Sequence, residues 1–444
     1  MIPGLRMPAP GRRHMFRALR HRNFRLFFAG QIISLTGTWM QSLAQSWLVY
    51  RLTQSAALLG AVGFASQVPV LFLSTFAGIF ADRHSRHRIV ISTQVAMMAQ
   101  ALVMAALTLT GLITVWEIFA LSLFLGVCNA FDIPARQSFL VEMVGDEDLM
   151  NAIALNSSMF NSARMIGPAV AGILVATLGE GLCFMINGLS YLAVIAGLLM
   201  MNVPAHPRDP GRARALSQLR EGITYTWRNA AIRSLLTLLA VVSLLGLPYT
   251  VLMPIFAEEV LDSGARGLGG LMTAAAFGAL IGALWLARRK HVMGLDRVVV
   301  RACAGFGAGL IFFALSRNYW LSAACLIPAG YCIMAQLGAT NTLVQSIVNN
   351  AMRGRVMGLY ATMFLGVAPF GSLLGGFLAH HFGAPAAVAL GGIACIAAAS
   401  ALGTKVRSLD IDAQLRALMN STEQGRSDAL QPGTAGSSGT RSSS

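Results

Sequence analysis

Amide and hydroxyl side chains recur on one face of the apolar stretch at 24–50. At 100° per residue they fall within an arc of about 100°, and they are Gln31, Ser34, Thr38, Gln41, Ser42 and Gln45. Polar groups in an apolar run either hydrogen-bond between helices or face a solvated cavity. Three glutamines on one face favour a solvated central cavity, which Gln31, Ser34, Thr38, Gln41 and Gln45 are predicted to line.

Arg164 is the ionisable residue expected deepest in an apolar run, some 12 residues into 152–178. One interpretation is an arginine that snorkels toward the nearer membrane face, paired with Asp132. The others are a counter-charge for an anionic substrate or half of a salt bridge that acts as a gate. Spacing alone leaves all three open.

The cysteines and histidines offer no metal site or catalytic centre. Six cysteines lie in apolar stretches without a CxxC spacing, and eight histidines lie in or beside loops. We therefore expect reduced, buried thiols, no metal and no cofactor. An enzyme embedded in the membrane would need facing ionisable groups, such as a histidine at membrane depth, and the sequence provides none.

The composition is that of a membrane protein. Among 444 residues, 33 Lys and Arg and 18 Asp and Glu give a net charge of +15, yet only 11% are charged and 55% are apolar. A soluble enzyme or a disordered chain would carry more charge. The basic residues are scattered between apolar runs, so a nucleic-acid-binding domain is not expected, and the predicted surroundings are a lipid bilayer.

Stretches long enough to cross a bilayer predict an all-α membrane protein with twelve transmembrane helices in two six-helix bundles. They lie at 24–50, 57–81, 89–112, 115–134, 152–178, 182–203, 234–257, 268–287, 298–315, 320–342, 357–379 and 385–403. The bundles are assigned to 1–203 and 234–404. A cytoplasmic loop with an amphipathic helix at 216–227 fills 204–233, and 405–444 is a disordered cytoplasmic tail.

The distribution of basic residues predicts the orientation. With the N-terminus inside, 28 Lys and Arg residues fall in cytoplasmic segments, and the outer loops carry only Arg51, Arg266 and Arg317. This bias places both termini in the cytoplasm. Short sequence matches also recur between the halves at offsets of about 204 residues, as in Met159–Phe160 and Met363–Phe364, which indicates a parallel repeat.

The loop after the second predicted helix carries a recognisable motif. Its residues are Gly78, Asp82, Arg83, Arg86 and Arg88. A glycine there allows close helix packing, Asp82 can pair with a helix end, and the arginines form a cytoplasmic cluster. The spacing resembles the G-x-x-x-D-R-x-G-R-R signature of the major facilitator superfamily, with Ser85 and His87 at two departures from it.

Two further segments extend the resemblance. Gly167, Pro168 and Gly172 resemble the motif of the antiporter branch, in which proline and glycine allow a helix to kink and pack closely. The stretch from Phe131 to Gln137, which contains Asp132 and Arg136, is similar to the subgroup of the enterobactin exporter and related drug and siderophore efflux proteins.

The resemblance implies a monomeric, proton-driven exporter of a small molecule in the bacterial inner membrane. Substrate would bind between the halves, lined by the polar face of 24–50, Asn129 and Arg164. Conformational coupling would involve Gly78, Asp82, Arg83, Arg86, Arg88, Asp132, Arg136, Gly167, Pro168 and Gly172. Uptake is the alternative within transport, while a channel fits a two-fold repeat without filter-like loops less well.

Overall fold

The computed structural model describes residues 16–202, 215–289, 292–349 and 351–408. Within these ranges every regular element of secondary structure is a helix, and the helices are joined by short turns and loops. Eleven helical segments are long and apolar enough to cross a membrane. The first long helix, α2 (Arg22–Thr53), is longer than most of them but carries the polar face, so a count of twelve crossings remains a prediction.

The N-terminal half begins with the short 3₁₀ helix η1 (Arg17–Arg20). The long helices are α2, α3 (Ala56–Arg83), α4 (Arg86–Leu109), α5 (Val115–Leu178) and α6 (Glu180–Leu199). Helix α5 joins two predicted spans and includes the polar segment between them. Its backbone breaks at Gly145, where φ is 69°, a conformation that glycine adopts without steric cost.

The C-terminal half follows the amphipathic helix α7 (Ala215–Arg228). Its first crossing, over Ala230–Val260, comprises α8 (Ala230–Val241), π-helix η2 (Val242–Gly246), α9 (Tyr249–Ile255) and π-helix η3 (Phe256–Val260). The remaining helices are α10 (Gly264–Ala287), α11 (Leu295–Leu315), α12 (Tyr319–Ile347), α13 (Arg353–Ala361), π-helix η4 (Thr362–Gly366), α14 (Ala368–Phe382) and α15 (Ala384–Ser408). The predicted tail beyond Ser408 lies outside the described residues.

Polar caps set several of these boundaries. The side chain of Ser55 accepts a hydrogen bond from the backbone of α3, and Asn318 does the same for α12. Thr114 and Glu117 form a capping box at the start of α5. Such side chains satisfy backbone N–H groups that a helix start leaves unpaired.

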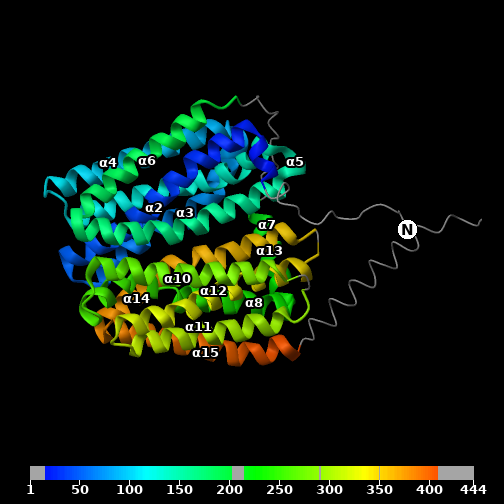
Figure 1. The fold of residues 1–444 in the computed structure, drawn as a ribbon. Helices are drawn as coiled ribbons and strands as arrows, with labels where there is room; N and C mark the ends of the chain where they lie inside the picture. Colours follow the sequence, from blue (N-terminus) through cyan, green and yellow to red (C-terminus); the bar gives the residue numbers. More distant parts are fainter. Residues whose placement is uncertain (1–15, 203–214, 290–291, 350, 409–444) are drawn as a thin grey trace, which may run out of the picture.

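The two halves lie side by side as two layers of helices, with α2–α6 in one layer and α8–α15 in the other (Figure 1). Helix α7 lies at one end of the molecule, next to α13, and we call this end the α7 end and the opposite one the far end. Glu221 of α7 pairs with Arg355 of α13 at 2.6 Å. Ile223 and Trp227 of α7 are exposed, as expected of a helix on a membrane surface.

Candidate substrate site between the two halves

At the far end, helices α5 and α10 touch through two glycines. A Cβ atom built on Gly172 would lie 2.9 Å from the Cα of Gly269, and one on Gly269 would lie 2.6 Å from the Pro168 carbonyl oxygen. Any side chain would push the helices apart, so these glycines permit contact between the backbones. The close packing expected around Gly172 is therefore present, and it joins the two halves.

Helices α3 and α14 make the equivalent contact. A Cβ atom on Gly60 would lie 2.5 Å from the Ser372 carbonyl oxygen, and one on Gly376 would lie 2.9 Å from the Cα of Gly60. Gly60 and Gly269 occupy corresponding helices of the two halves, as do Gly172 and Gly376. The two glycine contacts are therefore equivalent to each other, as expected if the two halves are repeats of one unit.

Side chains add to this closure. Tyr50 of α2 donates a hydrogen bond to the Glu259 carboxylate of η3. Further along the same interface, the rings of Phe64 and Phe370 meet edge to face, with centroids 5.7 Å apart. The far end is therefore held shut by backbone, polar and aromatic contacts together.

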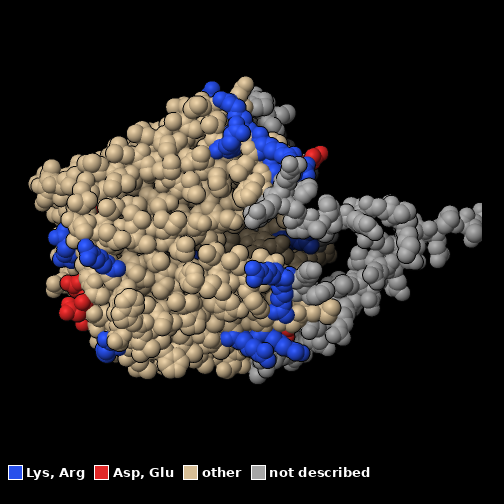
Figure 2. Space-filling view, in the orientation of Figure 1, with Lys and Arg blue, Asp and Glu red and all other residues tan. Residues whose placement is uncertain are grey.

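At the α7 end the two halves separate. Gly78 of α3 and Gly354 and Gly358 of α13 have no described atom within 4 Å of an added Cβ. Figure 2 shows a hollow between the halves that opens at this end, with basic side chains on both sides of it. The close approach expected at Gly78 is absent in this conformation, because the partner helix lies too far away.

The rest of the 78–88 motif lies at the rim of this opening. Arg86 pairs with Glu142 of α5 at 2.9 Å, and it makes a further interaction as well. Arg83 and Arg88 are exposed. Asp82 lies on α3, and its side chain is outside what the structure describes.

Arg164 lies where α5 meets α2 and faces an aromatic ring. Its guanidinium carbon is 5.7 Å from the centre of the Trp39 ring, within the range of a cation–π interaction. The exposed ring of Phe160 meets Trp39 edge to face at 5.7 Å. We call Trp39, Phe160 and Arg164 the aromatic–arginine cluster.

Asp132 does not pair with Arg164. One of its carboxylate oxygens pairs with Arg136 Nε at 3.0 Å. The other accepts hydrogen bonds from Thr93 Oγ1 at 2.9 Å and Gln94 Nε2 at 3.0 Å, both on α4. The predicted Asp132–Arg164 pair is therefore replaced by a pair at i, i+4 spacing on one helix.

The polar face of α2 turns into the N-terminal half. Gln41 donates to Gln100 of α4 at 3.0 Å and accepts from Asn187 of α6 at 2.6 Å. Gln45 donates to Ser122 of α5 at 3.0 Å. In this conformation these glutamines make the hydrogen bonds between helices that were the alternative to a cavity wall.

The other members of the polar face differ in exposure. Gln31 and Ser34 are buried, and Thr38 donates to the backbone of Ser34 at 2.9 Å. Ser42 is exposed. Their role in binding substrate stays a prediction.

Asn129, Gly167 and Pro168 complete the predicted set. Asn129 is partly exposed, and its side chain forms no hydrogen bond with the described residues. A Cβ on Gly167 would lie 2.9 Å from the carbonyl oxygen of Thr36, so this glycine packs α5 against α2. Pro168 lies within α5 and keeps helical dihedral angles, and its part in bending this helix stays a prediction.

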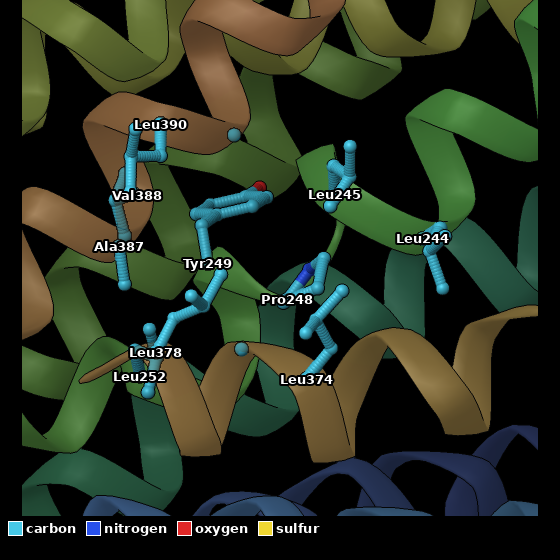
Figure 3. A pocket seen from close by; sticks show the side chains of 12 residues that line it. Leu244, Leu245, Pro248, Tyr249, Leu252, Leu374, Leu378, Ala387, Val388 and Leu390 are labelled. Carbon is cyan, nitrogen blue, oxygen red and sulfur yellow. The ribbon is translucent and has the colours of Figure 1, made fainter. Parts of the chain in front are cut away.

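A separate apolar cavity of about 140 Å³ lies within the C-terminal half. Its walls come from η2, α9, α14 and α15, and Tyr249 supplies a hydroxyl group (Figure 3). Gly375 and Gly391 contribute no side chains to it, which leaves room. Such a cavity suits an alkyl or ring group and offers no charge to bind.

The described part of the chain contains no candidate metal site. No three His, Cys, Asp or Glu side chains come close enough there to hold an ion.

Several residues of the interface carry little signal in the sequence. Trp39 and Phe160 are ordinary apolar residues of long apolar helices, and Tyr50 stands beside a predicted outer loop. Gly60 and Gly376 are two of 45 glycines. A comparison of corresponding helices in the two halves, Gly60 with Gly269 and Gly172 with Gly376, could have singled out the four glycines.

Relatives of known activity are membrane transporters. The staphyloferrin A transporter of Staphylococcus aureus is 26% identical over 83% of this chain and 93% of its own length. The multidrug efflux pump Tap of Mycobacterium tuberculosis is 27% identical over 81% and 87%. Macrolide efflux protein A of Streptococcus pyogenes is 22% identical over 88% and 99%.

Solved structures share the fold. A POT family transporter matches with a TM-score of 0.70 at 11% identity, covering 88% of this chain and 96% of the other. The nucleoside transporter NupG matches with a TM-score of 0.67 at 15% identity, covering 86% and 98%.

Nearly the whole chain matches one protein family. This family is described as transmembrane secretion effector, and the match covers residues 14–431. With the transporter relatives and the shared fold, this makes the protein a multi-pass membrane transporter of small molecules and not an enzyme. The chain belongs to the transmembrane secretion effector family of the major facilitator superfamily.

Proposed function

We propose that the protein exports a small molecule across the bacterial inner membrane by alternating access, driven by proton entry. The observation that carries this proposal is the asymmetry between the two ends of the interface. The far end is closed by two glycine contacts, and the α7 end is open. A transporter that alternates between two states must pass through a conformation of this kind.

We propose further that the α7 end faces the cytoplasm. Lys and Arg are concentrated in the segments that lie at this end, as the positive-inside rule requires. The conformation is then open to the inside, ready to take substrate from the cytoplasm. The termini would both be cytoplasmic, and one chain forms the whole site, which favours a working monomer.

The aromatic–arginine cluster is the best candidate for substrate contact. It combines a positive charge with two aromatic rings. Such a group suits a molecule with both a ring or alkyl body and an anionic group. The printed activities of the relatives, a siderophore transporter and pumps for drugs and macrolides, define the compounds to test first.

Transport in inverted membrane vesicles tests the function. Vesicles with the protein and an acidic interior should accumulate radiolabelled erythromycin, or an iron-free siderophore in parallel, and collapse of the proton gradient should release it. The control is the variant Gly172→Leu at matched expression, which cannot close the far end. Equal accumulation in vesicles with and without the protein would overturn the proposal for that compound.

Direction is decided in the same system. Uptake, the alternative, would be driven in right-side-out vesicles by an acidic exterior. Movement into right-side-out vesicles along with protons, and none into inverted ones, would replace export by uptake.

A further inference from the structure

Asp132 stands apart from the other acidic residues that the structure describes. It is 2% exposed, and it lies 17 residues from the start of α5 and 13 residues before the break at Gly145. At 1.5 Å per residue it is roughly 20 Å or more from either end of that segment. The other described acidic residues, such as Glu142, Glu180 and Glu259, lie near the ends of their spans.

The two carboxylate oxygens of Asp132 have different partners. One faces the charge of Arg136, and the other accepts hydrogen bonds from Thr93 and Gln94. This arrangement satisfies a charged carboxylate. A carboxylic acid in the same place would need an acceptor for its O–H group.

Gln94 can provide that acceptor. Its Oε1 atom is buried and has no hydrogen-bond partner among the described atoms, although Nε2 of the same amide donates to Asp132. An unpaired buried carbonyl costs about 1–3 kcal/mol. If the amide turns over, its oxygen takes the place of Nε2 and accepts the proton of a neutral Asp132.

Both protonation states of Asp132 therefore have partners within the same side chains. We infer that Asp132, with the reversible amide of Gln94, is the site that binds the coupling proton. This inference rests on the proton-driven transport proposed above. In the binding step a hydronium ion gives a proton to Asp132 Oδ1, the oxygen that faces Gln94: one O–H bond of hydronium breaks, one O–H bond forms on the carboxyl group, and a water molecule is released. The ion pair between Asp132 and Arg136 then opens.

The surroundings supply one counter-charge and a way in. On α5 the ionisable neighbours of Asp132 are Arg136 and Cys128, and on α6 the neighbour is Tyr191. From α4 it meets Thr93 and Gln94, and no ionisable side chain of α2 or α3 is recorded against it in the described part. The Arg136 side chain is 22% exposed, so the pair reaches solvent through its guanidinium.

Proton binding thereby changes how α4 holds α5. In the charged state, Thr93 and Gln94 of α4 both donate to a carboxylate that Arg136 neutralises. In the neutral state, Arg136 is released and an amide–acid pair joins the two helices. A site with two bonded arrangements of this kind gives the N-terminal half two states that a proton selects.

Infrared difference spectroscopy of the purified full-length protein between neutral and acidic pH tests the site without any substrate. We expect a carboxylic-acid carbonyl band from a buried group, which Asp132→Asn abolishes. In Asp132→Glu the band should persist at a shifted frequency, and this variant serves if Asp132→Asn does not fold. The matched control is Glu142→Gln, which breaks the Arg86–Glu142 pair at the membrane edge and should leave the band unchanged. An unaltered band in Asp132→Asn or Asp132→Glu would overturn the inference.

A transport measurement separates a coupling site from a structural pair. In vesicles, Asp132→Asn should still exchange labelled for unlabelled erythromycin. Its accumulation of erythromycin driven by a proton gradient should be at least tenfold lower than that of the unchanged protein. Loss of both in a correctly folded variant would make the pair structural, and retention of both would also contradict the inference. If erythromycin is not carried at all, the proposed substrate fails, but the infrared result still decides the proton site.

Discussion

Tyr50 and Glu259 join the two halves by a hydrogen bond between side chains at the closed far end. Tyr50 is almost fully buried, whereas Glu259 is exposed, so the contact lies at the boundary between the closed interface and solvent. This hydrogen bond joins two elements far apart in the sequence, α2 and η3, in the conformation that is shut at this end.

Removal of this hydrogen bond should favour opening of the far end. A hydrogen bond to a charged group is worth about 1.5–3 kcal/mol, so Tyr50→Phe should raise the open population by about tenfold or more. Distances between spin labels at the far ends of α3 and α14 would measure it. Glu258→Gln, which alters the neighbouring exposed acid, is the control, and equal distributions in both variants would contradict the prediction.

Glycine substitutions at the two ends should have opposite effects. Gly172→Leu places a side chain against Gly269 and should prevent closure of the far end. Gly78→Leu meets no described neighbour in this conformation and should fold normally, but it should hinder closure of the α7 end. Cysteine accessibility at each end, measured in membranes, should shift in opposite directions. A shift in the same direction for both variants would contradict it.

Arg164 should discriminate between substrates by charge. Arg164→Ala should weaken transport of anionic compounds by tens- to thousands-fold, the equivalent of about 2–5 kcal/mol, and leave neutral compounds nearly unchanged. Arg164→Lys should restore part of the loss. Because Asp132 pairs with Arg136, the additional change Asp132→Ala should give no rescue, and rescue would show that the two residues do pair in another state.

Gln41 should contribute to stability more than to affinity. Gln41→Leu strands the amide groups of Gln100 and Asn187, which costs about 1–3 kcal/mol for each buried group. The thermal unfolding temperature of the purified protein should fall, while the KM for transported compounds stays the same. A raised KM at unchanged unfolding temperature would instead make Gln41 a substrate ligand.

The orientation can be checked with fusions. Reporters attached at Ser444 and within the 258–267 loop should report opposite sides, the former cytoplasmic, because of the distribution of basic residues. A cytoplasmic signal from the 258–267 loop would make the span assignment wrong from the seventh crossing onward.

Much of the fold could be predicted because hydropathy and caps are local properties. Helix ends at Ser55 and Asn318 follow from residues beside them in the sequence. The extent of α5 could not be predicted in this way. The polar residues between its two spans remain helical, and only the positive φ of Gly145 marks the break.

The site was harder to predict because it depends on partners distant in the sequence. Periodicity showed that Gln41 and Gln45 share a face of α2, but it could not tell whether α4, α5 and α6 or a cavity would cover that face. The i, i+4 spacing of Asp132 and Arg136 could have indicated their ion pair, but the pairing that we considered for Asp132 was with Arg164. The Tyr50–Glu259 contact leaves no local trace, because it forms between the two halves.

The inward-facing polar side of α2 has a consequence for how the protein is made. This helix leaves the ribosome before α4, α5 and α6, and lipid offers its amides no hydrogen-bond partners. Those partners, Gln100, Ser122 and Asn187, are synthesised later. Nascent chains that end before α6 should therefore hold α2 loosely in the translocon or at the bilayer surface, and its firm insertion should await the arrival of Asn187.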